Sequence, residues 1–192
     1  MNEAALLLAA TLNAGTVLAL AALGLLINER AGIVNLGTEG IMLVAAVAGY
    51  AAAVHSGSDL LAFATGAAAG ALLAAVFGVL VIWLNTNQYA TGLALSLFGV
   101  GFSAFVGQPY TRERLGERTQ FDVPLLADIP FIGPALFKQH PMVWVAIGLA
   151  VALTWWLSKT KSGLTLRAVG ESPASAHALG IAVRPIRLAA VV

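Results

Sequence analysis

Residues 28–49 read NERAGIVNLGTEGIMLVAAVAG and separate two long apolar segments. The stretch holds charged and amide side chains, and Gly32, Gly37 and Gly40 punctuate it. This pattern is unfavourable in a lipid-facing helix, because backbone polar groups in hydrocarbon must be hydrogen-bonded internally and ionisable side chains there are costly. The pattern therefore predicts a polar break that lies against protein or a wet cavity, and we expect it to help line a solute pathway.

The composition places the chain among integral membrane proteins. Its 192 residues are 59% hydrophobic and 10% charged, with a mean hydropathy of +0.89, whereas a soluble domain is about 25% charged. The net charge of +1 and the lack of a basic run do not suggest nucleic acid as a partner. The absence of cysteine excludes disulfides and thiolate metal sites, and we expect no metal or cofactor.

Apolar runs of spanning length predict an all-α, polytopic helical bundle. A spanning helix needs about 20 apolar residues, and five segments qualify or nearly qualify: 4–27, 38–54, 60–84, 90–106 and 142–157. The first lacks the basic start of a secretory signal, so we expect a retained helix. A sixth run begins near residue 186, where the chain ends. The break at 28–40 and the glycine- and serine-rich segment 90–106 leave bent or re-entrant forms open.

Charge in the loops predicts the orientation. The long loop 108–141 has four basic and four acidic residues, whereas residues 158–187 have five basic residues and one acid. The positive-inside rule therefore places 158–187 in the cytoplasm and 108–141 outside the cell. Counting back through full spans places the N-terminus outside.

Polar residues next to the apolar segments are the candidates for the solute path, namely Asn35, Thr38, Glu39, Asn87 and Gln88. Two interpretations remain open for them. Thr38 and Glu39 fit the start of a helix, where a hydroxyl caps and a carboxylate suits the dipole, but an intramembrane carboxylate is also a functional candidate. Asn87 and Gln88 fit an ordinary polar turn as well as hydrogen bonding to a polar solute.

A short helix is predicted in the basic segment. Gly170 is expected to break the chain, Ser172 to cap the helix with Pro173 at its first position, and Gly180 to end it. Its small side chains permit close docking into a groove on a partner, although an ordinary connecting helix has the same features.

Three motifs together resemble a known family. They are IVNLGTEGIMLV (33–44), TNQYATG (86–92) and GLTLRAVGESPASAHALG (163–180). They resemble the permease subunits of bacterial ABC importers, in the group that transports branched-chain amino acids, ribose-type sugars and nucleosides. The chain is most similar to the nucleoside branch, whose receptors are basic membrane lipoproteins.

The resemblance implies a multi-pass protein of the bacterial inner membrane with several partners. These are a second permease, an ATP-binding cassette ATPase, an extracytoplasmic binding lipoprotein and membrane lipid. The short helix would dock on the ATPase, and the residues implied in this coupling are Gly170, Glu171, Ser172, Pro173, Ala174 and Gly180. The chain has no G-x-x-x-x-G-K-[ST] phosphate loop, so ATP hydrolysis is expected in a partner. Members of the family carry further spans, so residues 1–192 would be one incomplete permease domain.

We therefore expect a permease subunit that forms part of a translocation path for nucleosides or related small polar solutes. Simple sugars and branched-chain amino acids are the alternatives within the same class. A membrane scaffold that binds an ATPase without transporting is the alternative of another class, and a secondary transporter is weaker because only Glu39 suggests an ion relay.

Overall fold

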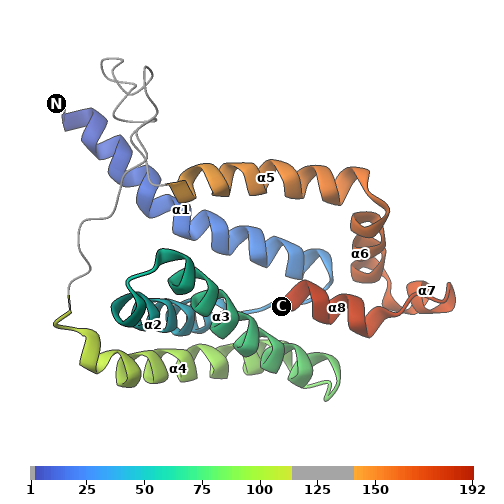
Figure 1. The fold of residues 1–192 in the computed structure, drawn as a ribbon. Coiled ribbons are helices and arrows are strands. Elements are labelled where there is room, and N and C mark those ends of the chain that lie inside the picture. Colours follow the sequence, from blue (N-terminus) through green and yellow to red (C-terminus); the bar gives the residue numbers. More distant parts are fainter. Residues whose placement is uncertain (1–2, 114–140) are drawn as a thin grey trace. The chain divides into compact units, whose positions relative to one another are not determined.

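The computed structural model describes residues 3–113 and 141–192. Every regular element in these two ranges is a helix (Figure 1). The elements are α1 (Glu3–Arg30), α2 (Thr38–Ser56), α3 (Asp59–Ile82), α4 (Gln88–Gly107), η1 (Gln108–Tyr110), α5 (Pro141–Lys159), α6 (Lys161–Glu171), α7 (Pro173–Ala178) and α8 (Val183–Val191). The predicted all-α fold is confirmed.

The apolar segments predicted from hydropathy are all helices of spanning length. Within the described residues, α1, α2, α3, α4 with η1, and α5 are the five helices long and apolar enough to cross a membrane. The helix ends differ from the prediction by a few residues. The largest difference is at α1, which continues through the polar residues Asn28, Glu29 and Arg30, because their side chains are compatible with helical backbone.

The glycine- and serine-rich segment 90–106 is neither broken nor bent into separate pieces. It belongs to one continuous α-helix, α4, which a short 3₁₀ turn, η1, follows. Its glycines allow close helix packing instead of changes in backbone direction, as described below. The predicted loop 108–141 lies almost wholly outside the described residues, which include only 108–113 and 141 of it.

The chain forms two compact units. One combines residues 1–23 with 116–160, and the other combines 24–115 with 161–192. The described part of the first unit is the greater part of α1 together with α5. The second unit contains the end of α1, α2 to η1, and α6 to α8. All of the predicted path and coupling residues lie in the second unit.

Small residues bring the long helices of the second unit together. In this unit α2 contacts α3 and α4, and α3 contacts α8 (Figure 1). A Cβ atom added at Gly66 of α3 would lie 3.0 Å from the Ala45 carbonyl oxygen of α2, and one added at Gly70 would lie 3.4 Å from the Ala45 Cβ. Small residues at these positions therefore let the backbones of α2 and α3 approach closely.

The packed helices enclose one apolar core, in which Phe77 and Ile33 are fully buried. The other buried members are Val44, Leu73, Ala74, Ile82, Leu95 and Val191. Ile33 comes from the polar break that follows α1, so the core holds this break against the helices. The polar stretch is therefore part of the folded structure of the unit and not a surface loop.

The basic segment 158–187 forms a helix, α6, ahead of the short helix that the sequence predicts. Gly170 does not break the chain, since α6 runs through it to Glu171. The predicted capping of the next helix is correct: Ser172 Oγ accepts a hydrogen bond of 3.3 Å from the Ser175 N–H at the start of α7. Gly180 has a φ of 79°, the left-handed conformation that ends helices.

Candidate functional site

The polar break is the α1–α2 loop, residues 31–37. The N–H groups of Ala31 and Ile33 both donate to the Asn28 carbonyl oxygen at 3.0 Å. Gly32, between them, has a φ of 75°, which glycine adopts at little cost. Helix α1 therefore ends at Arg30, and the left-handed Gly32 turns the chain away from the helix axis. The loop is shorter than the predicted break, which began at Asn28.

Helix α4 satisfies the backbone of this loop. The Val34 N–H donates to Gln88 Oε1 at 3.1 Å, and Ser96 Oγ donates to the Leu36 carbonyl oxygen at 2.8 Å. Between these two contacts, a Cβ at Gly92 would lie only 2.9 Å from the Leu36 nitrogen. Backbone groups outside regular helices need other hydrogen-bond partners when they are covered by protein, and α4 provides those partners here.

Two predicted path residues stabilise the loop itself. Asn35 is buried, and its Oδ1 accepts a hydrogen bond of 2.9 Å from the Gly37 N–H. Thr38 Oγ1 donates to the Asn35 carbonyl oxygen at 3.1 Å. The expectation that Thr38 caps α2 is wrong: Gly37 holds the N-cap position and makes no side-chain capping bond. The Thr38 hydroxyl instead completes the turn that precedes the helix.

The remaining candidates have different surroundings. Asn87 caps α4, because its Oδ1 accepts from the N–H groups of Tyr89 and Ala90 at 2.9 Å and 3.2 Å. Glu39 is exposed in the first turn of α2. Thus Gln88 joins Asn35 and Thr38 at the α1–α2 loop, whereas the Asn87 amide oxygen bonds its own helix.

Ser96 is a loop-binding residue that the sequence argument did not single out. Its signal was present, since Gly92, Ser96 and Gly99 follow one another at intervals of four and three, which is one face of a helix. They mark the face of α4 on which the loop and α2 lie.

We expect Gln88→Leu to lower the free energy of unfolding by about 1–3 kcal/mol, because the Val34 N–H would lose its acceptor in a partly buried position. Denaturation of the purified protein in detergent, followed by circular dichroism, measures the change. Gln108→Leu is the matched control, since Gln108 is exposed in η1. Equal stabilities of the two variants would contradict the role of Gln88.

The coupling segment contacts the same loop. A Cβ added at Gly170 of α6 would overlap the Arg30 carbonyl oxygen and lie 3.0 Å from the Gly32 nitrogen. From α8, Arg187 Nε donates to the Ala31 carbonyl oxygen at 3.0 Å. Sequence reasoning counted Arg187 only as a positive charge. The end of α1 and the start of the loop are therefore contacted by Gly170 of α6 and by Arg187 of α8.

Arg187 is a cation in a partly buried position. It lies outside the five candidate spans, and desolvation by burial lowers the pKa of its guanidinium from the ordinary value. An arginine keeps its charge in proteins because its pKa starts above about 12. Its hydrogen bond to Ala31 therefore joins a full charge to a backbone carbonyl, which is stronger than a bond between neutral groups.

The predicted coupling residues lie in α7 and directly before and after it. Glu171, Ala174 and Gly180 are exposed, whereas Gly170, Ser172 and Pro173 are partly covered. At the end of α7, the Leu179 side chain is 80% exposed. Three residues earlier, Ala176 is buried at 2% exposure. One face of α7 therefore packs against the second unit, and the opposite face is exposed.

A family model described as "Branched-chain amino acid transport system / permease component" matches residues 7–192. The chain belongs to this permease family. The predicted group is thereby confirmed, and the permease family together with the five spanning helices confirms a multi-pass location in the cell membrane.

Several permeases are similar to the chain over most of its length. It is 41% identical over 197 residues to a putative glucose ABC transporter permease protein, TsgC13, of Haloferax volcanii, covering 100% of this chain and 60% of the relative. It is 33% identical to the nucleoside ABC transporter permease protein NupC of Lactococcus lactis, with 100% and 64% covered. It is 32% identical to the guanosine ABC transporter permease protein NupQ of Bacillus subtilis, with 93% and 60% covered.

The chain thus spans between 60% and 64% of the length of these curated relatives. No solved structure matches it. All three relatives are named as ABC transporter permeases, and their names include both sugar and nucleoside transport.

Proposed function

We propose that this permease forms part of the translocation path of an ATP-driven importer for nucleosides or related small polar solutes. The observation that carries the proposal is the contact of Gly170 with the α1–α2 loop. It joins the segment expected to dock on an ATPase to the segment expected to line the solute path. A movement of α6 and α7 has a direct route to the loop through this contact.

The choice of nucleosides has two supports. NupC and NupQ are named as nucleoside and guanosine permeases, and both align with nearly the whole chain. Amide and carboxyl side chains near the loop, such as Glu39 and Asn87, suit a solute that presents both donors and acceptors. The runner-up is a simple sugar, which the similarity to the glucose permease favours. Branched-chain amino acids follow from the family description alone.

ATP hydrolysis belongs to a partner in this proposal. The sequence lacks the phosphate loop of such ATPases, so the permease would be a transport subunit and not an enzyme. The residues proposed to transmit the coupling are Gly170, Glu171, Ser172, Pro173, Ala174 and Gly180. The exposed Leu179 beside them would enter an apolar groove on the ATPase.

Three further partners complete the proposed importer. A second permease would form the other half of the path, an extracytoplasmic lipoprotein would deliver the solute, and membrane lipid would surround the spans. A scaffold that binds an ATPase without transporting is the rival. A scaffold needs α7, but it does not need a polar loop whose backbone α4 binds through Gln88 and Ser96.

We expect Glu39→Gln to lower uptake about tenfold, equivalent to about 1.4 kcal/mol of lost stabilisation, without loss of assembly. Glu39 is exposed beside the loop, so its carboxylate can meet the solute. Uptake of labelled nucleoside into vesicles that contain the complete transporter measures the effect, with unlabelled glucose and a branched-chain amino acid as competitors.

Glu29→Gln is the matched control, because Glu29 is also exposed but lies in the last turn of α1. Normal uptake by Glu39→Gln would reduce Glu39 to a helix-dipole residue. Stronger competition by glucose than by nucleoside would favour the sugar alternative. No uptake of any of the three solutes by an assembled, ATP-hydrolysing complex would favour the scaffold.

A further inference from the structure

A cavity of about 710 Å³ lies within the second unit. Its walls come from the start of the α1–α2 loop, the end of α3, the α3–α4 turn, α7, and the start of α8. The contacts that α4, α6 and α8 make with the α1–α2 loop do not fill this cavity, which α7 borders. The proposed function uses three of its lining residues, Gln88, Pro173 and Ala174, but assigns no ligand to the cavity itself.

The charge of the lining has one sign. Arg184, Arg187 and His177 line the cavity, and neither aspartate nor glutamate is among the described residues that do so. Arg187 is held in place by the hydrogen bond from its Nε to the Ala31 carbonyl oxygen at 3.0 Å. This bond fixes the plane of the guanidinium and leaves its terminal nitrogens for another acceptor. Arg184 is exposed at the mouth, one turn earlier on α8.

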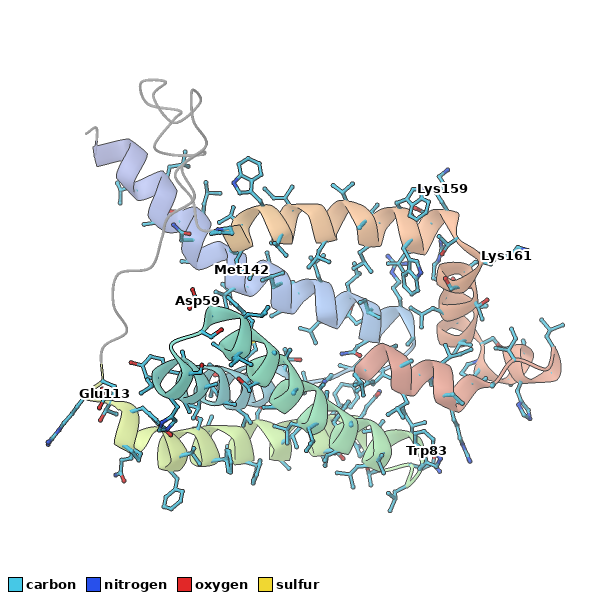
Figure 2. The ribbon with its side chains drawn as sticks, viewed as in Figure 1. Asp59, Trp83, Glu113, Met142, Lys159 and Lys161 are labelled. Atoms are coloured by element: carbon cyan, nitrogen blue, oxygen red, sulfur yellow. The ribbon has the colours of Figure 1, made fainter. Side chains whose placement is uncertain are left out.

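The rest of the lining divides into polar and apolar parts. Asn85 and Gln88 add amide groups, while Ile33, Ile82 and Val183 form apolar walls. Trp83 lies at the end of α3, next to these walls in the sequence (Figure 2), and tryptophan is the residue typical of the membrane–water interface. The cavity therefore has the polarity of the level where lipid headgroups meet protein.

We propose that this cavity binds a phosphate group between Arg184 and Arg187. Guanidinium groups bind phosphate through paired N–H donors, and a partly buried cation without an acidic neighbour in the lining favours an anionic ligand. His177 and the amides of Asn85 and Gln88 can donate to the remaining phosphate oxygens. The phosphate can belong to the headgroup of an anionic lipid, whose glycerol would meet the apolar walls, or to a soluble phosphate. Basic pockets between the transmembrane helices of other membrane proteins bind lipid headgroups.

The test compares the wild-type complete transporter with three variants of it. The variant Arg184→Gln/Arg187→Gln removes both guanidiniums, and Arg184→Gln alone removes only the exposed one, which keeps the Arg187–Ala31 bond intact. Lys159→Gln/Lys161→Gln is the matched control, because it also removes two positive charges. Both lysines are exposed at the junction of α5 and α6 (Figure 2), and neither lines the cavity. Each form is purified in mild detergent.

Two measurements separate the sources of the phosphate. Native mass spectrometry after exposure to phosphatidylglycerol counts retained lipid, and thermal unfolding with inorganic phosphate measures soluble binding. We expect wild type and the lysine control to bind alike, and each lost arginine to weaken binding about tenfold. A difference in lipid retention assigns a lipid headgroup, and a difference only with inorganic phosphate assigns a soluble ligand. The proposal is overturned if neither measurement distinguishes Arg184→Gln from wild type, or if the lysine control loses as much as the double arginine variant.

Discussion

Gly99→Ala is expected to separate α2 from α4 and to cost at least about 3 kcal/mol of unfolding free energy. An added Cβ at Gly99 would overlap the backbone of Gly40. The approach is reciprocal, since a Cβ at Gly40 would lie 2.6 Å from the Leu95 carbonyl oxygen. Backbone atoms cannot rotate away as side chains can, so the helices must move apart. Overpacking of this kind costs about 1–3 kcal/mol or more.

The same movement would break the hydrogen bonds that hold the α1–α2 loop. Ser96 and Gln88 both lie on α4 and bond the Leu36 carbonyl and the Val34 N–H. Each bond contributes about 1 kcal/mol net, and a covered loop group left without a partner costs about 1–3 kcal/mol. The overpacking and the lost bonds act together because they depend on one helix crossing.

Detergent denaturation of the purified protein, followed by circular dichroism, measures this effect. Gly101→Ala is the control in the same helix, because nothing lies within 4 Å of a Cβ at Gly101. We expect Gly101→Ala to be neutral or slightly stabilising, since alanine favours helix over glycine by about 1 kcal/mol. Equal free energies of unfolding for Gly99→Ala and Gly101→Ala would show that α2 and α4 do not cross at Gly40 and Gly99.

Gly170→Ala is expected to lower solute uptake by the complete transporter at least about tenfold while ATP hydrolysis continues. An added Cβ would overlap the Arg30 carbonyl oxygen, so α6 must move away from the end of α1. The movement would also strain the Arg187–Ala31 hydrogen bond. In the proposed function this contact transmits the movement of α7 to the α1–α2 loop, and its loss leaves the ATPase working without transport.

The readout is the ratio of solute imported to ATP hydrolysed in vesicles. Gly24→Ala is the matched control: Gly24 lies in α1, and nothing lies within 4 Å of a Cβ added there. Its ratio should match wild type. A wild-type ratio in Gly170→Ala, in protein that assembles normally, would remove Gly170 from the coupling route.

Much of the fold follows from local features of the sequence. The five spans are predictable because hydropathy over about 20 residues depends on composition alone, and the described helices confirm each of them. The start and end of α7 are predictable because Ser172, Pro173 and Gly180 act on backbone within a few residues of themselves. The family is recognisable from three motifs whose order is visible in the chain.

Local features fail where one residue has two uses. Gly170 was expected to break a helix, but it lies inside α6 and allows contact with Arg30. Thr38 was expected to cap α2, but its hydroxyl bonds the Asn35 carbonyl. Glycine and threonine suit both roles by their chemistry, and the choice between the roles depends on which backbone lies opposite.

The sequence by itself determined that the chain is a helical membrane permease with a polar break after its first span. The tertiary structure decided what the break is: a loop bonded by Gln88 and Ser96 and held at its start by Gly170 and Arg187. These partners are distant in the chain, and Ala31 and Arg187 are separated by 156 positions. Contacts at such separations depend on the packing of whole helices, which no local pattern of residues encodes.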